Sequence, residues 1–108
     1  LKSARRAQEK GVTLVPWEVG AVHHLLCVRV DAAKRDRVID FLRGAGVECG
    51  VHYPSDLSSQ PATSRFAREP CPNATAAAST LISLPMDPLM SNSDIEVSCR
   101  ALATSLRR

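Results

Sequence analysis

Two patterns of apolar residues along the chain predict strands. Residues 22–30, VHHLLCVRV, form an apolar run with several β-branched side chains, which is typical of a strand. In residues 47–52 every second side chain shares a face, with Val47, Cys49 and Val51 on one and Glu48, Gly50 and His52 on the other. This alternation predicts a second strand with one buried face.

Two other segments have apolar residues at helical spacing. The first follows Asp31, which is suited to cap a helix, and ends at Gly46. The second begins at Ser91, where Asp94 three residues later predicts a capping box. The inward positions are Val38, Phe41, Leu42 and Ala45 in the first helix and Ile95, Cys99, Leu102 and Leu106 in the second. Both helices are therefore predicted to pack on the sheet.

The remaining segments are less regular. Residues 1–10 are compatible with a charged helix that Gly11 ends, and residues 12–21 predict a linker or an edge strand. Residues 55–73 predict a loop with a short helix near residues 62–68. A short helix with Ala74, Ala77, Ala78 and Leu81 inward is then expected to lead into a few extended residues before Pro85. The order of elements predicts one α+β domain of helices on a small sheet.

Composition argues against several classes of function. The net charge of +3 comes from scattered residues and the chain has only four aromatic residues, which disfavours nucleic-acid binding. An RNA-binding sheet would need stacking aromatic side chains, which residues 22–30 lack. No cysteine has a partner at zinc-ligand spacing, so a metal site is not expected. We expect free thiols rather than two disulfides, because Cys27 and Cys49 lie in apolar runs.

The chain contains no segment that predicts membrane insertion or secretion. No apolar run approaches the roughly 20 residues of a spanning helix, and residues 1–11 have no apolar core of the signal-peptide kind. Asn73 begins a glycosylation sequon, which without a secretion signal is expected to be a chance match. A cytosolic protein is therefore expected.

The end of the second predicted strand offers a candidate site. His52 and Tyr53 close this strand and open a polar loop, where a rigid scaffold commonly presents binding groups. Pro54 biases Tyr53 towards an extended backbone, which would hold both side chains on a stiff segment. Binding and simple packing explain this pair equally well on these grounds.

Other candidate chemistry is weaker. His23 and His24 are neighbours on a predicted strand, so they point to opposite faces and cannot chelate one metal ion together. Lys2, Lys10 and Lys34 fall on exposed or terminal positions, so none is expected to be desolvated as Schiff-base chemistry requires. No serine lies in a nucleophile elbow, and no phosphate loop is present in the sequence. Residue chemistry alone therefore predicts an α+β domain with a candidate histidine-tyrosine site.

Several motifs occur in the order that one enzyme family shows. They are HLLCVRV at residues 24–30, FLRGAGVECGVHYP at 41–54, QPA at 60–62, SLPMDP at 83–88 and SNSDIEVSCRAL at 91–102. Together they resemble the C-terminal small domain of the DegT/DnrJ/EryC1/StrS aminotransferases, vitamin B6-dependent enzymes that aminate keto sugars attached to nucleotides. The resemblance assigns residues 1–20 to the end of a connecting helix and a linker, and residues 21–108 to the small domain, a small antiparallel-type sheet covered by helices.

This resemblance implies a fold-type I aminotransferase that works as a homodimer with active sites at the subunit interface. Its large domain holds pyridoxal phosphate and supplies both the Schiff-base lysine and the carboxylate at the pyridine nitrogen. No residue of this chain is then expected to be catalytic or to hold the cofactor. The chain would form one wall of the substrate cleft and be catalytically silent alone.

The same resemblance singles out four substrate-binding candidates. His52, Tyr53 and Pro54 match the family's His-Tyr-Pro, and Gln60 matches the start of its next Gln-Pro segment. The loop departs from the family at residues 57–58, where leucine-histidine is common, and at Thr63, where an aromatic residue is common. These departures and the chain's length motivate an alternative, a stand-alone binding or dimerisation module with the same architecture.

Overall fold

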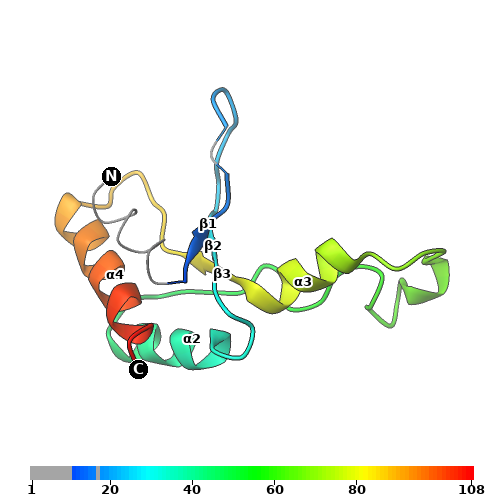
Figure 1. The fold of residues 1–108 in the computed structure, drawn as a ribbon. Coiled ribbons are helices and arrows are strands. Elements are labelled where there is room, and N and C mark those ends of the chain that lie inside the picture. The colour runs from blue at the N-terminus through cyan, green and yellow to red at the C-terminus, as the bar shows by residue number, and fades with distance from the viewer. Residues whose placement is uncertain (1–10, 17) are drawn as a thin grey trace.

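The computed structural model describes residues 11–16 and 18–108, which form a small sheet with helices (Figure 1). Strands β1 (Thr13–Leu14), β2 (Leu26–Arg29) and β3 (Leu81–Leu84) pair antiparallel in the order β1-β2-β3. The other elements are α2 (Arg35–Gly44), the 3-10 turn η1 (Ser64–Phe66), α3 (Pro72–Thr80) and α4 (Asn92–Ser105). The predicted α+β class with an antiparallel sheet is confirmed.

One face of the sheet is closed by α2 and α4, which lie below and to the left of it in Figure 1. The core between them is apolar, and Val38, Leu42 and Ile82 are completely buried. Its other members are Val12, Val28, Val30, Ile39, Val47, Cys49, Ala101 and Leu102. Burying one such side chain stabilises the fold by about 1.5–3 kcal/mol. We call the sheet, residues 45–54, α2 and α4 the body.

The strands are shorter than the sequence predicts. Of the predicted strand 22–30 only residues 26–29 pair, because β3 offers four residues before Pro85, which has no amide hydrogen to donate. Residues 12–21 contribute the edge strand β1, one of the two predicted alternatives. In the predicted strand 47–52 only Gly50 pairs, through an isolated bridge to Ser83. Its alternation is nevertheless present, since Val47 and Cys49 are buried and Glu48 is exposed.

The prediction that Asp31 caps helix α2 is wrong. Lys34, not Asp31, is the N-cap residue and its side chain makes no capping bond. The Asp31 carboxylate instead accepts a hydrogen bond of 2.9 Å from the Ala33 amide, which closes the turn before the helix. Val38 and Leu42 face the core as predicted, whereas Ala45 lies beyond the last helical turn and is exposed.

Helix α4 begins with the predicted capping box. The Ser91 hydroxyl accepts from the Asp94 amide at 3.2 Å, and the Asp94 carboxylate accepts from the Ser91 amide at 2.9 Å. The predicted inward stripe holds only in part, since Leu102 is buried but Ile95 is 48% exposed. The helix packs against α2 mainly through its C-terminal half, so its first turns remain open to solvent.

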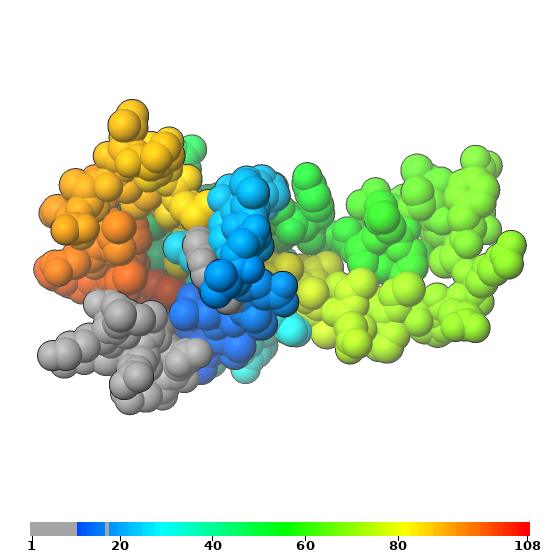
Figure 2. Space-filling model, turned by 90° about the horizontal axis from the view of Figure 1, so that it is seen from above, coloured from blue at the N-terminus to red at the C-terminus, as the bar shows by residue number. Residues whose placement is uncertain are grey.

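Residues 55–80 extend from the body as an arm, which points to the right in Figures 1 and 2. The arm consists of a loop, residues 55–71, and α3. The predicted loop and the predicted helix after it are both present, with η1 inside the range predicted for a short helix. The Cα radius of gyration is 15.0 Å, whereas a compact chain of this length has about 13 Å. The arm is therefore a projection rather than part of a closed globule.

The C-terminal end of α3 fastens the arm to the body. Arg35 Nη1 donates to the Ala78 carbonyl at 2.6 Å, and the Val30 amide donates to the Thr80 carbonyl at 3.0 Å. Arg29 also donates to the Thr80 hydroxyl at 3.0 Å. The charged helix predicted for residues 1–10, with Lys2 and Lys10, lies outside the described residues.

Candidate functional site

The candidate site lies on the face of the sheet opposite α2 and α4. Residues that are directly opposite in an antiparallel pair share a face. Cys27 is opposite Ser83 in β2 and β3, and Gly50 bridges to Ser83 from the other side. These three residues form a row on the outer face. His52 belongs to the same face because it follows Gly50 by two residues in an extended segment.

The imidazole of His52 lies across this row and contacts Ser83. His52 Nδ1 is 2.9 Å from the Ser83 hydroxyl oxygen, which is in turn 3.5 Å from the Cys27 sulfur. A Cβ at position 50 would lie 3.2 Å from His52 Cε1, tighter than ordinary van der Waals contact. Glycine at this position therefore leaves the space that the ring occupies. The ring covers Ser83, which is only 5% exposed.

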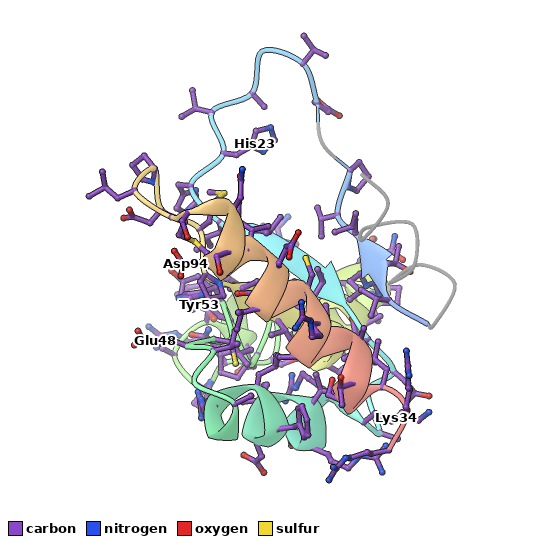
Figure 3. All side chains as sticks on the ribbon, turned by 90° about the vertical axis from the view of Figure 1, so that its left-hand side faces the viewer. His23, Lys34, Glu48, Tyr53 and Asp94 are labelled. Carbon is purple, nitrogen blue, oxygen red and sulfur yellow. The ribbon has the colours of Figure 1, made fainter. Side chains whose placement is uncertain are left out.

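Tyr53 stands beside His52 and projects into solvent. The two rings meet edge to face, with centroids 5.6 Å apart and planes at 80°. The peptide bond between them is cis, and the Tyr53 side chain is 71% exposed. Figure 3 shows Tyr53 well apart from His23, which lies on the projecting β1–β2 connection, and from Lys34. His23 therefore shares no site with Tyr53.

A groove of about 460 Å³ runs between the arm loop and α3. This volume lies in the range that small-molecule sites occupy, roughly 300–1,000 Å³. Two of the four predicted site residues, Tyr53 and Gln60, line it, whereas His52 and Pro54 do not. Most of the remaining lining is apolar and includes Leu57, Ala74, Ala77 and Leu81. The structure therefore brings Tyr53 and Gln60 to one groove and places His52 at its margin, over Ser83.

Asp56 fastens the loop side of this groove to α3. Its carboxylate accepts hydrogen bonds from the Ser58 hydroxyl, from the Ser59 amide at 3.1 Å and hydroxyl at 2.9 Å, and from the Thr75 hydroxyl at 3.0 Å. The bonds from Ser58 and Ser59, then that from Thr75, lower the pKa of Asp56 to about 2. The sequence interpretation missed this residue, although an aspartate with serines two and three positions later is the signal of a local side-chain turn.

Metal and cofactor ligands are scarce around the groove. No three histidine, cysteine or acidic side chains gather as a metal site in the part of the chain that the structure describes. All four cysteines lie in that part and are free, and burial raises the pKa of the Cys49 thiol. Lys34, the one lysine within the described ranges, is exposed at the start of α2 and does not line the groove. These residues therefore do not fit pyridoxal phosphate, which needs a lysine at its carbonyl carbon.

Comparison with known proteins gives one consistent family. The model of the DegT/DnrJ/EryC1/StrS aminotransferase family matches residues 3–103. Over 82 residues the chain is 37% identical to the UDP-2-acetamido-2-deoxy-3-oxo-D-glucuronate aminotransferase of Pseudomonas aeruginosa. It also resembles the aminotransferase TlmJ of Streptoalloteichus hindustanus, with 25% identity and a TM-score of 0.75 over 98% of this chain. NtdA of Bacillus subtilis, solved with bound cofactor PMP, shares the fold at 22% identity with a TM-score of 0.83 over 99% of this chain.

These relatives are much longer than the chain. It spans 22% of the length of the Pseudomonas enzyme, 30% of TlmJ and 26% of NtdA. The match therefore concerns one part of each relative, and it includes the outer face of the sheet and the arm described above. No helix within residues 11–16 and 18–108 has both the length and the apolar character required to cross a membrane.

Proposed function

Since the chain belongs to the DegT/DnrJ/EryC1/StrS aminotransferase family, we propose that it forms the C-terminal small domain of a pyridoxal-phosphate-dependent aminotransferase acting on a nucleotide-linked keto sugar. The observation that carries this proposal is the 37% identity to an enzyme whose name specifies a UDP-linked 3-oxo sugar. The chain would contribute one wall of the substrate cleft.

Four residues of that wall are the proposed sugar contacts. The His52 imidazole and the Tyr53 hydroxyl would donate hydrogen bonds to substrate oxygens, and Pro54 would keep this segment extended. The Gln60 amide lies at the groove, where Nε2 is 3.4 Å from the Ser55 carbonyl oxygen. The described lining has no cation, and the carboxylate of Asp56 is ionised at neutral pH. The wall therefore suits the sugar end of the substrate, and the diphosphate would find its cations elsewhere in the parent protein.

The chemistry would depend on the rest of the parent protein. Pyridoxal phosphate supplies the electron sink for amino transfer, and the described residues provide no lysine that could hold it. Following the family resemblance, we propose that the cofactor belongs to a large domain at the interface of a homodimer, and that the parent protein works in the cytosol. The isolated 108 residues would be catalytically silent, and absorbance of protein-bound pyridoxal phosphate in this chain alone would contradict that part of the proposal.

The substrate role is tested by kinetics of the full-length protein with UDP-2-acetamido-2-deoxy-3-oxo-D-glucuronate and a panel of amino-acid donors. The variants His52→Asn and Tyr53→Phe should raise KM for the sugar nucleotide while changing kcat less. Phe66→Ala is the control, because Phe66 is 68% exposed at the outer end of the arm and does not line the groove. Unchanged kinetics in both site variants would refute the substrate role.

A second reading, a stand-alone binding or dimerisation module with the same architecture, is favoured by the apolar lining of the groove. Such a lining suits contact with another protein as well as with a ligand. The coding sequence upstream of this chain separates the two readings. A large domain with a cofactor lysine in the same reading frame would exclude the module.

A further inference from the structure

We propose that Ser83 is a positioning residue for His52, and that it fixes the imidazole as the tautomer that carries its hydrogen on Nε2. The inference deepens the proposed function and rests on it for the identity of the ligand. Ser83 is not among the predicted site residues, and its proposed role is to orient the imidazole of one that is. The geometry that carries it consists of one buried hydroxyl between a ring nitrogen and a thiol.

The hydroxyl of Ser83 has two neighbours that can hydrogen-bond with it. His52 Nδ1 lies at 2.9 Å and Cys27 Sγ at 3.5 Å. Ser83 is 5% exposed, so its hydroxyl hydrogen is directed to one of these atoms rather than left to bulk water. An imidazole nitrogen is a good acceptor, whereas a cysteine sulfur is a weak one. The hydrogen therefore goes to Nδ1, and the Cys27 thiol is free to donate to the Ser83 oxygen.

This assignment decides what His52 offers to a ligand. A neutral imidazole carries one hydrogen, so an Nδ1 that accepts from Ser83 leaves the hydrogen on Nε2. His52 is exposed to solvent, so the hydrogen on Nε2 is available to a ligand. His52 would then be a hydrogen-bond donor towards acceptor oxygens, which are the groups that keto sugars and their carboxylates present.

The sheet holds the two partners at a fixed separation. Ser83 and Gly50 exchange two main-chain hydrogen bonds, at 2.8 Å and 3.1 Å, and His52 follows Gly50 by two residues. The absent side chain at Gly50 leaves room for the ring between them. Ser83 thus acts on the ring through side-chain contact, while the main chain supports its position.

The test measures the imidazole ¹⁵N chemical shifts of His52 in the full-length protein labelled on histidine, together with KM for the sugar nucleotide. The His52 signals are assigned by their absence in His52→Asn. At pH 8 the wild-type ring should show an unprotonated Nδ1 and a protonated Nε2. Ser83→Ala should give a mixture of tautomers and raise KM about two- to tenfold, the range expected for one lost hydrogen bond.

Two further variants separate positioning from general damage. Ser83→Thr keeps the hydroxyl and should restore both the tautomer and most of the affinity. Ser105→Ala is the matched control, because Ser105 is also a buried serine, 2% exposed, but lies in α4. Its hydroxyl donates to the Leu102 carbonyl at 2.7 Å. This variant should leave the His52 shifts unchanged.

The outcomes distinguish this inference from the function on which it rests. The positioning role is overturned if the wild-type His52 carries its hydrogen on Nδ1, or if the His52 ¹⁵N shifts are the same in Ser83→Ala as in the wild type. A changed ring with an unchanged KM supports the positioning role and refutes the substrate role of His52. A Ser105→Ala variant that altered the ring as much as Ser83→Ala would also overturn the assignment.

Discussion

The body and the arm of this molecule are stabilised in different ways. The body closes an apolar core in which Leu42 and Ile82 are fully buried. The arm has one buried side chain, Ala78 at its base, and leaves Leu57 and Phe66 about 70% exposed. Its shape depends instead on polar bonds converging on Asp56. Cooperative stability should therefore reside in the body, while the arm responds to local changes.

The N-terminal ends of helices α4 and α3 show the same difference between the body and the arm. Helix α4 in the body begins with a complete capping box. Helix α3 in the arm has Cys71 as its N-cap residue, whose side chain makes no capping bond, and only Pro72 is a favourable first residue. Helix α4 thus combines side-chain capping with burial, and α3 has little of either.

The largest expected effect comes from emptying part of the body's core. Leu42→Ala should lower the free energy of unfolding by about 2–5 kcal/mol, because the lost methyl groups leave a cavity. Leu57→Ala removes the same atoms from an arm residue that is 71% exposed. It should change the free energy of unfolding by less than about 0.5 kcal/mol. Urea unfolding of the protein measures both, and equal losses would contradict the contrast.

A smaller effect is expected from the helix starts. Ser91→Ala should cost about 1 kcal/mol of unfolding free energy, since it removes the N-cap oxygen that accepts from the Asp94 amide. Cys71→Ala should cost much less, because the Cys71 side chain caps nothing. Thermal unfolding of the two variants is the measurement. A larger loss for Cys71→Ala would show that the arm helix depends on its N-cap residue after all.

The arm should also loosen at low pH. The pKa of Asp56 is about 2 in the fold, below the usual 3.8, so its bonds contribute fully above pH 4 and are lost as pH falls towards 2. The Ser59 amide lies 3.1 Å from both this carboxylate and the Asp56 carbonyl oxygen, so its hydrogen exchange should lose part of its protection in that window. In Asp56→Asn this step should disappear, while the loss of protection at the Ser91 amide in acid remains, since bonds from Ser91 lower the pKa of Asp94. A step at Ser59 that persists in Asp56→Asn would assign it to another group.

The smallest effect comes from the Thr75 hydroxyl, which lies 3.0 Å from the Asp56 carboxylate and 3.1 Å from the Cys71 carbonyl oxygen. Thr75→Val removes the hydroxyl that donates to Asp56 and should raise the rate of proteolysis within residues 57–70 by about twofold. Thr104→Val is its control in the body, because the Thr104 hydroxyl bonds only the Arg100 carbonyl of its own helix. Equal rates in the two variants would show that this bond does not restrain the loop.

The fold was largely predictable because its main signals are local. The capping box at Ser91 and the helix around Leu42 follow from spacing alone. Strand lengths were not predictable, since the length of a strand depends on the strand with which it pairs. Strand β2 pairs over only four residues because its partner β3 ends before Pro85. Asp31 was wrongly predicted as an N-cap because the same side-chain oxygen serves equally well in a turn just before a helix.

The site was predictable only as a position along the chain. Alternation placed His52 opposite the buried face, and the resemblance singled out Tyr53 and Gln60, which line one groove; their role as substrate contacts stays a prediction. The partner of the imidazole was hidden, because Ser83 lies 31 residues from His52 and meets it only through strand register. The groove likewise forms between segments whose proximity no local pattern predicts.

The bridge between Gly50 and Ser83 joins the outer face to the core. A shift of one residue in this pairing would turn Ser83 inward and Ile82 outward. The hydrophobic core therefore fixes the main chain around His52, and the Ser83 hydroxyl that this register presents holds the ring. The entropy of ordering this side chain is lost during folding, so a ligand that meets the imidazole would find it preorganised.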